Sequence, residues 1–296
     1  MRFRSDVKKA LANHEAVVAL ETTLIAHGQK YPGNLEAAHG MENAVRSEGA
    51  VPATIGILKG EIVVGIDDAD IEYYARNRSI LKCSRRDLPI MLAKKLDGAT
   101  TVCGTLVLAH QAGIKVFCSG GLGGVHRGHP FDVSADLQEL ARTPMIAISS
   151  GCKALLDIEA TREMLETYGI PVIGYGTDEF PGFYARQSGF PVDVRVDTPE
   201  EVAAIARERD RLGLSSALLV TVPVPAEDEL PMAEAEEAIN RAVELADEQG
   251  LHGRDVTPFL LAKIGELTNG RSVRANSSLL LNNAHVAAKI ALALTK

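Results

Sequence analysis

Short apolar runs rich in Val and Ile alternate with segments of helical periodicity along most of this chain. The runs are residues 17–20, 53–58, 62–66, 115–119, 145–149, 171–175, 194–196 and 217–222. A strand that is apolar along its whole length must be covered on both faces, and alternation with helices is typical of parallel sheets. The sequence therefore predicts a three-layer α/β/α fold with a mixed, mostly parallel central sheet.

The segments between these runs have helical spacing, and some begin with clear capping signals. Asp197-Thr198-Pro199-Glu200-Glu201 is typical of a helix N-cap followed by Pro and acidic residues in the first turn. The expected helices are residues 34–47, 87–96, 134–141, 154–168, 199–212, 231–249, 257–268 and 277–294. No linker, repeat or low-complexity tract divides the chain, so we expect a single domain over residues 1–296.

Charge and composition exclude several classes of function. The chain is 46% hydrophobic, enough to fill a core, and its 31 Lys and Arg against 39 Asp and Glu leave a net charge of −8. With only 4% aromatic residues and no Trp, it offers neither the basic footprint nor the stacking surface that nucleic acid polymers require. No secretory signal and no membrane-length apolar run is visible, so we expect a soluble, cytoplasmic protein that contacts no membrane.

Four cysteines, Cys83, Cys103, Cys118 and Cys152, are widely spaced and have apolar neighbours. They form no C-x-x-C pair, which a zinc or redox site would favour. The spacing favours free, buried thiols in a reducing compartment over a zinc or disulfide framework.

A glycine-rich loop follows one of the apolar runs. Residues 116–128 contain five glycines together with His126 and Arg127. Glycines let backbone N–H groups approach a ligand closely, and an arginine adds charge-assisted bonds to an anion. The loop therefore indicates a phosphate or sugar cradle, although a plain solvated turn is the alternative. It matches neither dinucleotide-binding nor P-loop patterns, so no nucleotide cofactor is implied.

Three ionisable side chains lie where apolar runs end. Glu21 ends the run 17–20, and a partly buried carboxylate there is a reasonable general acid or base, with a turn or capping role as the alternative. Lys82 and Lys153 also lie beside apolar runs. Loss of solvation lowers the pKa of a lysine and frees its amine for Schiff-base chemistry, but each of the two taken alone is more typical of a surface lysine.

Carboxylates and amides supply weaker signals. Asp132 and Asp136 are four residues apart and could hold a hard divalent cation, but two carboxylates make a weak metal motif and either one could cap a helix. Asn276, Asn282 and Asn283 interrupt an apolar helical pattern. Buried amides need hydrogen-bond partners, from a site or from the backbone.

Several strings in this sequence resemble one family. They are ALETTLIAHG (19–28), GAVPATIGIL (49–58), SRRDLP (84–89), GATTV (98–102), GGLGGVHRG (120–128), FDVSADLQELA (131–141), TPFLLAKIGELT (257–268) and NNA (282–284). The chain resembles the pseudouridine-5′-phosphate glycosidases, also called the indigoidine synthase A family. The strings occur in the same order as in that family, and the similarity runs from about residue 15 to the C-terminus. Pro130 stands where the family usually has Thr, and Cys152 replaces a typical Ala.

The resemblance implies a reaction and roles for individual residues. The family reversibly converts pseudouridine 5′-phosphate and water into uracil and D-ribose 5-phosphate, with one Mn²⁺ per subunit, in a homotrimer of single α/β/α domains. By motif position, Glu21 matches the proton donor, Lys153 the lysine that binds the sugar covalently, Lys82 a substrate-binding lysine and Asp132 the metal ligand. Further matches to substrate-contacting or nearby positions are Val102, Ser134, Ala135, Asp136, His126 and Asn276.

The chemistry explains why a lysine is needed beside a carboxylate. Ordinary glycosidases protonate a leaving oxygen, whereas the bond here joins two carbons and offers no such lone pair. A lysine that holds C1′ as an imine supplies the missing electron sink. Two rival functions remain at this point: a C-glycosynthase joining ribose 5-phosphate to an aromatic natural-product acceptor, and a non-catalytic sugar-phosphate-binding module.

Overall fold

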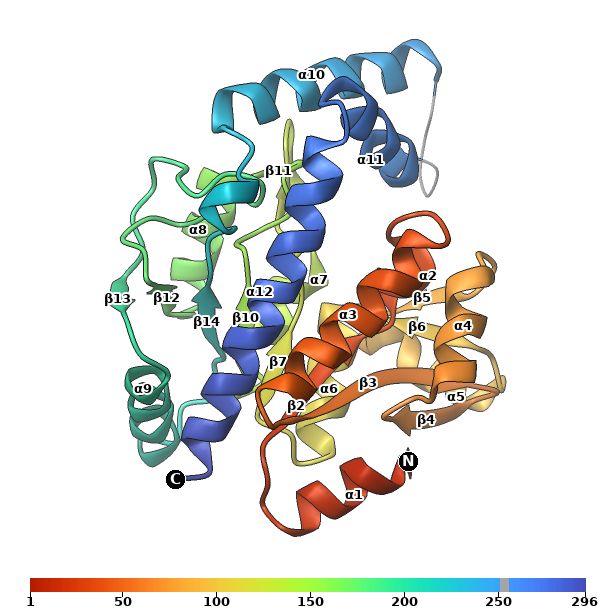
Figure 1. The fold of residues 1–296 in the computed structure, drawn as a ribbon, viewed down its shortest axis with the longest axis vertical. Coiled ribbons are helices and arrows are strands. Elements are labelled where there is room, and N and C mark those ends of the chain that lie inside the picture. Colours follow the sequence, from red (N-terminus) through yellow and green to blue (C-terminus); the bar gives the residue numbers. More distant parts are fainter. Residues whose placement is uncertain (251–255) are drawn as a thin grey trace.

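A large mixed sheet forms the centre of the molecule (Figure 1). The computed structural model describes residues 1–250 and 256–296, and within them this sheet has 11 strands. In sheet order these are β1 (Arg2–Phe3), β4 (Glu61–Val64), β3 (Val51–Leu58), β2 (Val17–Glu21), β7 (Val116–Cys118), β10 (Ile146–Ser149), β14 (Leu218–Thr221), β12 (Val172–Tyr175) and β13 (Val194–Val196), with β6 (Gly98–Thr100) and β5 (Leu81–Cys83) branching from β3.

The sheet is mostly parallel, as the apolar runs predict. Every neighbouring pair from β3 to β13 is parallel, while β4 and β6 pair with β3 in the antiparallel sense. Side chains of β2 alternate between two separate cores: Val18 and Leu20 join one cluster, and Val17 and Ala19 join the other. All eight apolar runs form strands, which confirms the predicted fold class.

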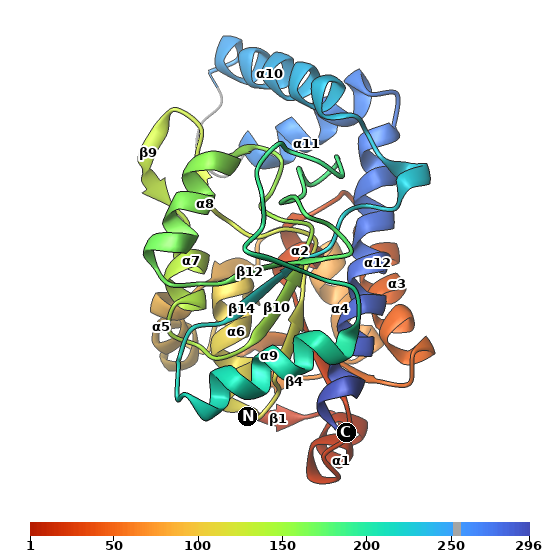
Figure 2. The same ribbon diagram turned by 90° about the vertical axis from the view of Figure 1, so that its left-hand side faces the viewer.

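Helices cover both faces of the sheet and so make three layers (Figure 2). One face carries α3 (Gly33–Ser47), α9 (Pro199–Arg211) and α12 (Arg271–Leu294), and α12 packs on both α3 and α9. The other face carries α1 (Ser5–Ala12), α5 (Leu88–Ala93), α6 (Val102–Gln111), α7 (Ala135–Leu140) and α8 (Ile158–Thr167). None of the helices within the described residues is long and apolar enough to cross a membrane.

Four more α-helices and a second, smaller sheet complete the described part of the fold. α2 (Thr23–His27) follows β2 directly, and α4 (Asp68–Arg76) packs against it. α10 (Met232–Glu248) and α11 (Val256–Leu267) pack on each other at the top of Figure 1. A small separate sheet has the order β11 (Leu156–Asp157), β8 (Val125–His126) and β9 (His129–Val133).

Some helix boundaries differ from those expected. The helix expected over 154–168 begins at Ile158, because residues 156–157 pair with β8 and Asp157 then caps the helix by accepting from Ala160 N at 2.9 Å. The helix expected from residue 277 begins at Arg271. By contrast, the cap at Thr198 is confirmed, with a capping box to Glu201 and Pro199 in the first turn.

The four cysteines are free and buried in the described part of the chain, as the spacing predicts. Burial raises the pKa of the Cys83, Cys103 and Cys152 thiols to about 12. These side chains therefore remain neutral thiols that fill the core.

Candidate active site

A cavity opens beyond the carboxyl ends of neighbouring parallel strands, where ligands bind in open α/β sheets. Glu21 is the last residue of β2, Ser119 directly follows β7, and Lys153 comes four residues after β10. The cavity has a volume of about 170 Å³. A single water needs only about 10–15 Å³ on this scale, so the space admits a small organic ligand.

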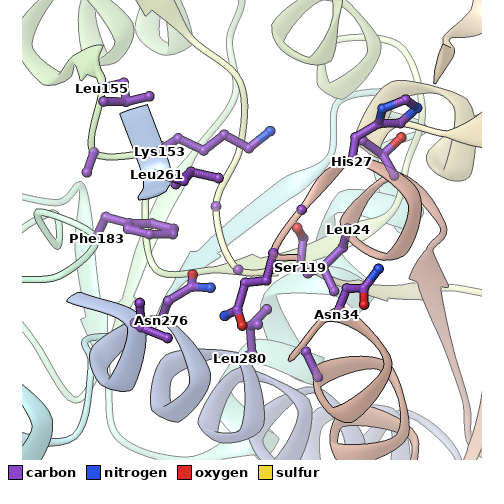
Figure 3. Close-up of a pocket in the computed structure, with 18 of the residues that line it drawn as sticks. Leu24, His27, Asn34, Ser119, Lys153, Leu155, Phe183, Leu261, Asn276 and Leu280 are labelled. Carbon is purple, nitrogen blue, oxygen red and sulfur yellow. The ribbon is translucent and has the colours of Figure 1, made fainter. Parts of the chain in front are cut away.

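The cavity brings together residues that are far apart in the sequence. Of the predicted site residues, Glu21, Lys82, Lys153 and Asn276 line it. Figure 3 shows Lys153 and Asn276 converging on the cavity from the loop after β10 and from α12. Much of the remaining wall is apolar, and is made by Leu24, Ala37, Ala154, Leu155, Phe183, Leu261, Val273 and Leu280.

Glu21 is a buried carboxyl group, with only 7% of the residue exposed. Burial raises the pKa of Glu21, although the charge of Lys153 and a hydrogen bond from Ser119 Oγ to Glu21 Oε1 act in the opposite direction. A carboxyl group with a raised pKa keeps its proton to a higher pH than an ordinary glutamate does, which suits a general acid. The structure therefore gives Glu21 an environment that favours proton donation.

Two lysines share the cavity with this carboxyl group. Both Lys82, in β5, and Lys153 keep exposed side chains. The pKa of Lys82 is lowered by partial burial and by the positive charge of Lys153, while Glu21 and Asp136 act in the opposite direction. An amine with a lowered pKa is more often neutral, and two cations close together attract a phosphate or carboxylate.

The main chain around Lys153 is firmly held. Lys153 N donates to Leu122 O at 3.0 Å, and Leu156 N donates to Lys153 O at 2.9 Å. Arg127 donates from Nε to Leu156 O at 3.1 Å and from Nη2 to Ala154 O at 3.4 Å. The guanidinium expected to bind an anion is thus engaged with the backbone, where it fixes the segment that carries Lys153.

The glycine-rich loop divides into two parts. Gly120 and Gly121 line the cavity. Gly123 and Gly124 instead pack against other elements, because a Cβ at these positions would lie 2.2 Å from Ser134 Oγ and 2.3 Å from Thr161 Oγ1. Only the first part of the loop is therefore placed to contact a ligand in the cavity, and the second part provides close packing.

Asp136 is buried and accepts two backbone hydrogen bonds. Its Oδ1 accepts from Cys103 N at 2.9 Å, in the first turn of α6, and its Oδ2 accepts from Gly123 N at 2.8 Å. Asp136 thereby fastens the glycine-rich loop to the start of α6. Three other residues predicted to contact substrate do not line the cavity. Val102 is the buried first residue of α6, Ser134 caps α7, and Ala135 is exposed.

Asp132 and His126 lie on the hairpin of β8 and β9, outside the cavity lining. His126 Nδ1 is 4.0 Å from Asp132 Oδ2, and the Asp132 side chain is 69% exposed. No group of three His, Cys, Asp or Glu suited to a metal occurs among residues 1–250 and 256–296. The Asp132 carboxylate is the kind of ligand that suits a hard cation which keeps most of its other ligands as water or phosphate oxygens.

Two polar residues of the site were not assigned a role from the sequence. Ser119 donates a hydrogen bond from Oγ to Glu21 Oε1, and it lies in the glycine-rich segment at the end of an apolar run. Asn283 is fully buried in α12, and its Nδ2 donates to Ser119 O at 3.0 Å and to Ser150 Oγ at 3.1 Å. Its position within an apolar helical pattern indicated only that it needs partners. Asn283 fixes the loop that carries Ser119.

The fold and the cavity define a class: α/β proteins that place a carboxyl group and lysines beyond the carboxyl ends of parallel strands. Within it, this chain belongs to the indigoidine synthase A family. The family model described as "Indigoidine synthase A like protein" matches residues 6–293.

Relatives and solved structures agree with this membership. The chain is 50% identical over 293 residues to a pseudouridine-5′-phosphate glycosidase of Caldanaerobacter subterraneus subsp. tengcongensis, covering 98% of this chain and 95% of the relative. It is 48% identical to the enzyme of that name from Clostridium botulinum, over 100% of this chain and 97% of the relative. The prealnumycin C-glycosynthase AlnA, crystallised with ribulose 5-phosphate, superposes with a TM-score of 0.91 at 40% identity, covering 99% and 96%. An indigoidine synthase A-like protein from Thermotoga maritima superposes with a TM-score of 0.90 at 39% identity, over 100% of this chain and 96% of that protein.

Proposed function

We propose that this protein is a pseudouridine-5′-phosphate glycosidase, which reversibly cleaves the C1′–C5 bond of pseudouridine 5′-phosphate to give uracil and D-ribose 5-phosphate. The observation that carries the proposal is one cavity lined by a buried carboxyl group, two lysines and an apolar wall. Identities of 48–50% over nearly the whole length of enzymes with this name support it.

Glu21 acts as the acid that opens the sugar. It donates its proton to the ring oxygen O4′, and the C1′–O4′ bond breaks. The amine of Lys153 forms a bond to C1′ and passes a proton to the Glu21 carboxylate that the first step leaves. When Glu21 returns this proton to C5 of the base, the C1′–C5 bond breaks, the nitrogen lone pair completes an imine, and uracil leaves. Water then hydrolyses the imine to ribose 5-phosphate and restores the lysine.

Charged groups inside and outside the cavity serve the rest of the substrate. Lys82 binds the phosphate as a cation in the cavity that the start of the glycine-rich loop also lines. Asp132, on the hairpin outside the cavity lining, would hold Mn²⁺, which would supply positive charge to substrate oxygens when it is bound. Asn276 contributes a carboxamide to the same cavity.

A C-glycosynthase that joins ribose 5-phosphate to a larger aromatic acceptor is the second candidate. The apolar wall of the cavity and the likeness to AlnA favour it. The identity to AlnA is 40%, against 48–50% for the glycosidases named above. The same lysine chemistry serves both, because the acceptor carbon is the only group that changes.

A pair of lysine substitutions tests the proposal. Wild-type protein with Mn²⁺ is incubated with pseudouridine 5′-phosphate, and uracil and ribose 5-phosphate are quantified by chromatography. Lys153→Arg keeps a cation but removes the nucleophilic amine, so we expect turnover to fall at least about 1,000-fold. Lys82→Arg is the matched control, with a raised KM and a kcat within about 10-fold of wild type.

Two results would contradict this function. Wild-type protein that releases no uracil, but joins ribose 5-phosphate to a larger aromatic compound, would favour the synthase. A Lys153→Arg variant with near-normal turnover would remove the covalent step.

A further inference from the structure

Phe183 adopts an unusual backbone conformation beside the cavity. Its φ is 64°, in the left-handed region that a bulky side chain seldom occupies. It lies in a tight turn in which Gly182 N donates to Ala185 O at 3.0 Å. Conformations of this kind persist where the surrounding structure fixes them, and they cluster at functional sites. The turn thus holds an aromatic ring at the wall of the cavity, where only 6% of the residue is exposed.

The ring packs on the glycine-rich loop next to Lys153. A Cβ at Gly121 would lie 2.6 Å from Phe183 Cε2 and 2.8 Å from Cδ2, so only glycine allows this approach. The same Cβ would lie 3.3 Å from Lys153 N. The position that a Cβ of Gly121 would occupy is therefore close to both the Phe183 ring and the main-chain nitrogen of Lys153. In Figure 3, Phe183, Lys153 and Leu261 surround the same part of the cavity.

The position of this ring fits the part of the substrate that is bonded to C1′. If Lys153 holds C1′, the base lies one bond from that carbon and so beside the residues that flank the lysine. This part of the wall has the apolar side chain of Leu261 (Figure 3), which suits the face of a flat ring better than a phosphate. Aromatic side chains bind bases by stacking on their π-faces.

We propose that the ring of Phe183 stacks on the base of the substrate and thereby determines the preference for a planar, aromatic leaving group. This inference rests on the proposed function. Of the parts of the substrate, Phe183 contacts only the base, so its loss weakens binding of uracil while the covalent step at Lys153 is retained. The glycine at position 121 and the left-handed turn are the features of the chain that place the ring.

Tyr184 provides a matched control. Its ring centroid lies 4.8 Å from that of Phe183 at an interplanar angle of 72°, and it also lines the cavity. Tyr184→Phe removes only a hydroxyl group and keeps the edge-to-face packing of the pair. A general disturbance of this wall would impair both variants, whereas a loss of stacking would impair only the Phe183 variant.

The experiment separates base binding from sugar binding. For wild type, Phe183→Leu and Tyr184→Phe, the KM of uracil is measured in the synthesis direction, and ribose 5-phosphate is trapped on the protein by borohydride. We expect Phe183→Leu to raise the KM of uracil about 10-fold, or about 1.4 kcal/mol, with trapping within about twofold of wild type. Tyr184→Phe changes neither value by more than about twofold. A KM of uracil within about twofold of wild type in Phe183→Leu overturns the proposal.

A second comparison uses only the wild-type protein, so it tests the proposal even if Phe183→Leu fails to fold. 5,6-Dihydrouracil has the same carbonyl and N–H groups as uracil but lacks the flat aromatic ring. As inhibitors of the wild-type cleavage reaction, uracil should bind at least about fivefold more tightly than dihydrouracil. Equal inhibition overturns the role of Phe183. Wild-type protein that neither traps ribose 5-phosphate nor makes product refutes the proposed function itself, and the stacking role with it.

Discussion

Ser119 and Glu21 meet at the ends of two neighbouring strands. Leu20 of β2 pairs in register with Cys118 of β7, so the next residue of each strand lies opposite the other, and Ser119 Oγ donates a hydrogen bond to Glu21 Oε1. The bond favours the ionised carboxylate, whereas burial favours the protonated acid. The hydroxyl group of Ser119 and the charge of Lys153 thus both offset the effect of burial on the pKa of the proposed acid.

Removing that hydroxyl should alter the pH dependence of activity. In Ser119→Ala the carboxylate loses a stabilising donor, so the pKa of Glu21 rises further. Because the protonated form is the active acid, we expect the alkaline limb of the kcat profile to move to higher pH. A loss of about 10-fold in kcat near neutral pH accompanies it, because the carboxyl group is less well oriented. An alkaline limb at or below the wild-type pH would contradict the role of Ser119.

Replacing Glu21 itself should separate stability from activity. A carboxyl group with a raised pKa binds its proton more tightly in the folded protein, so stability falls as pH rises above its ordinary value of 4.5. Glu21→Gln keeps the shape and removes the buried charge. We expect it to abolish turnover, yet to raise the free energy of unfolding by about 1 kcal/mol at pH 8, a gain that disappears below pH 4.5. Urea unfolding at the two pH values measures this, and a destabilised variant at pH 8 would be inconsistent with it.

Asp136 should act by positioning the loop rather than by contacting the reacting atoms. Both of its oxygens accept backbone N–H groups, and an amide can serve only one of them. We expect Asp136→Asn to lower stability by about 1–3 kcal/mol and kcat/KM by at least about 10-fold.

The same substitution at Asp157, which caps α8, is the control for Asp136→Asn. Because Asn and Asp cap helices about equally well, we expect it to change stability by about 0.5 kcal/mol or less and to leave kcat/KM within about twofold of wild type. Steady-state kinetics and urea unfolding of both variants provide the comparison. Equal losses of activity in the two would show that Asp136 has no special link to the site.

Much of the fold was predictable because eight of the strands in the large sheet carry an apolar run of their own. α6 was not predicted, since eight of its ten residues are buried and no polar face reveals the helical period. Its capping residue Thr101, which accepts from Gly104 N, was the available signal. The short strands β1, β5, β6, β8 and β11 were also missed, because two or three residues carry no periodicity. The strand β9 and the helices α1, α2 and α4 were not predicted either.

The site was predictable only in part. Glu21 and Lys153 stand beside apolar runs, and the order of strands in the sheet, which the sequence does not specify, is what brings them together. Lys82 comes from a branch of the sheet that periodicity missed. The family was predicted from the motifs and is confirmed by the matching family model. The single domain, the homotrimer, the cytoplasmic location and the metal at Asp132 stay predictions.

The most direct measurement of the central claim is covalent trapping at Lys153. Wild-type protein is incubated with ribose 5-phosphate and borohydride, which reduces an imine to a stable amine, and the modified peptide is sequenced by mass spectrometry. We predict one reduced pentose phosphate per chain, attached to the peptide that contains Lys153, and none in Lys153→Arg. Label on Lys82 instead, or no label on a protein that still turns over its substrate, would contradict the account.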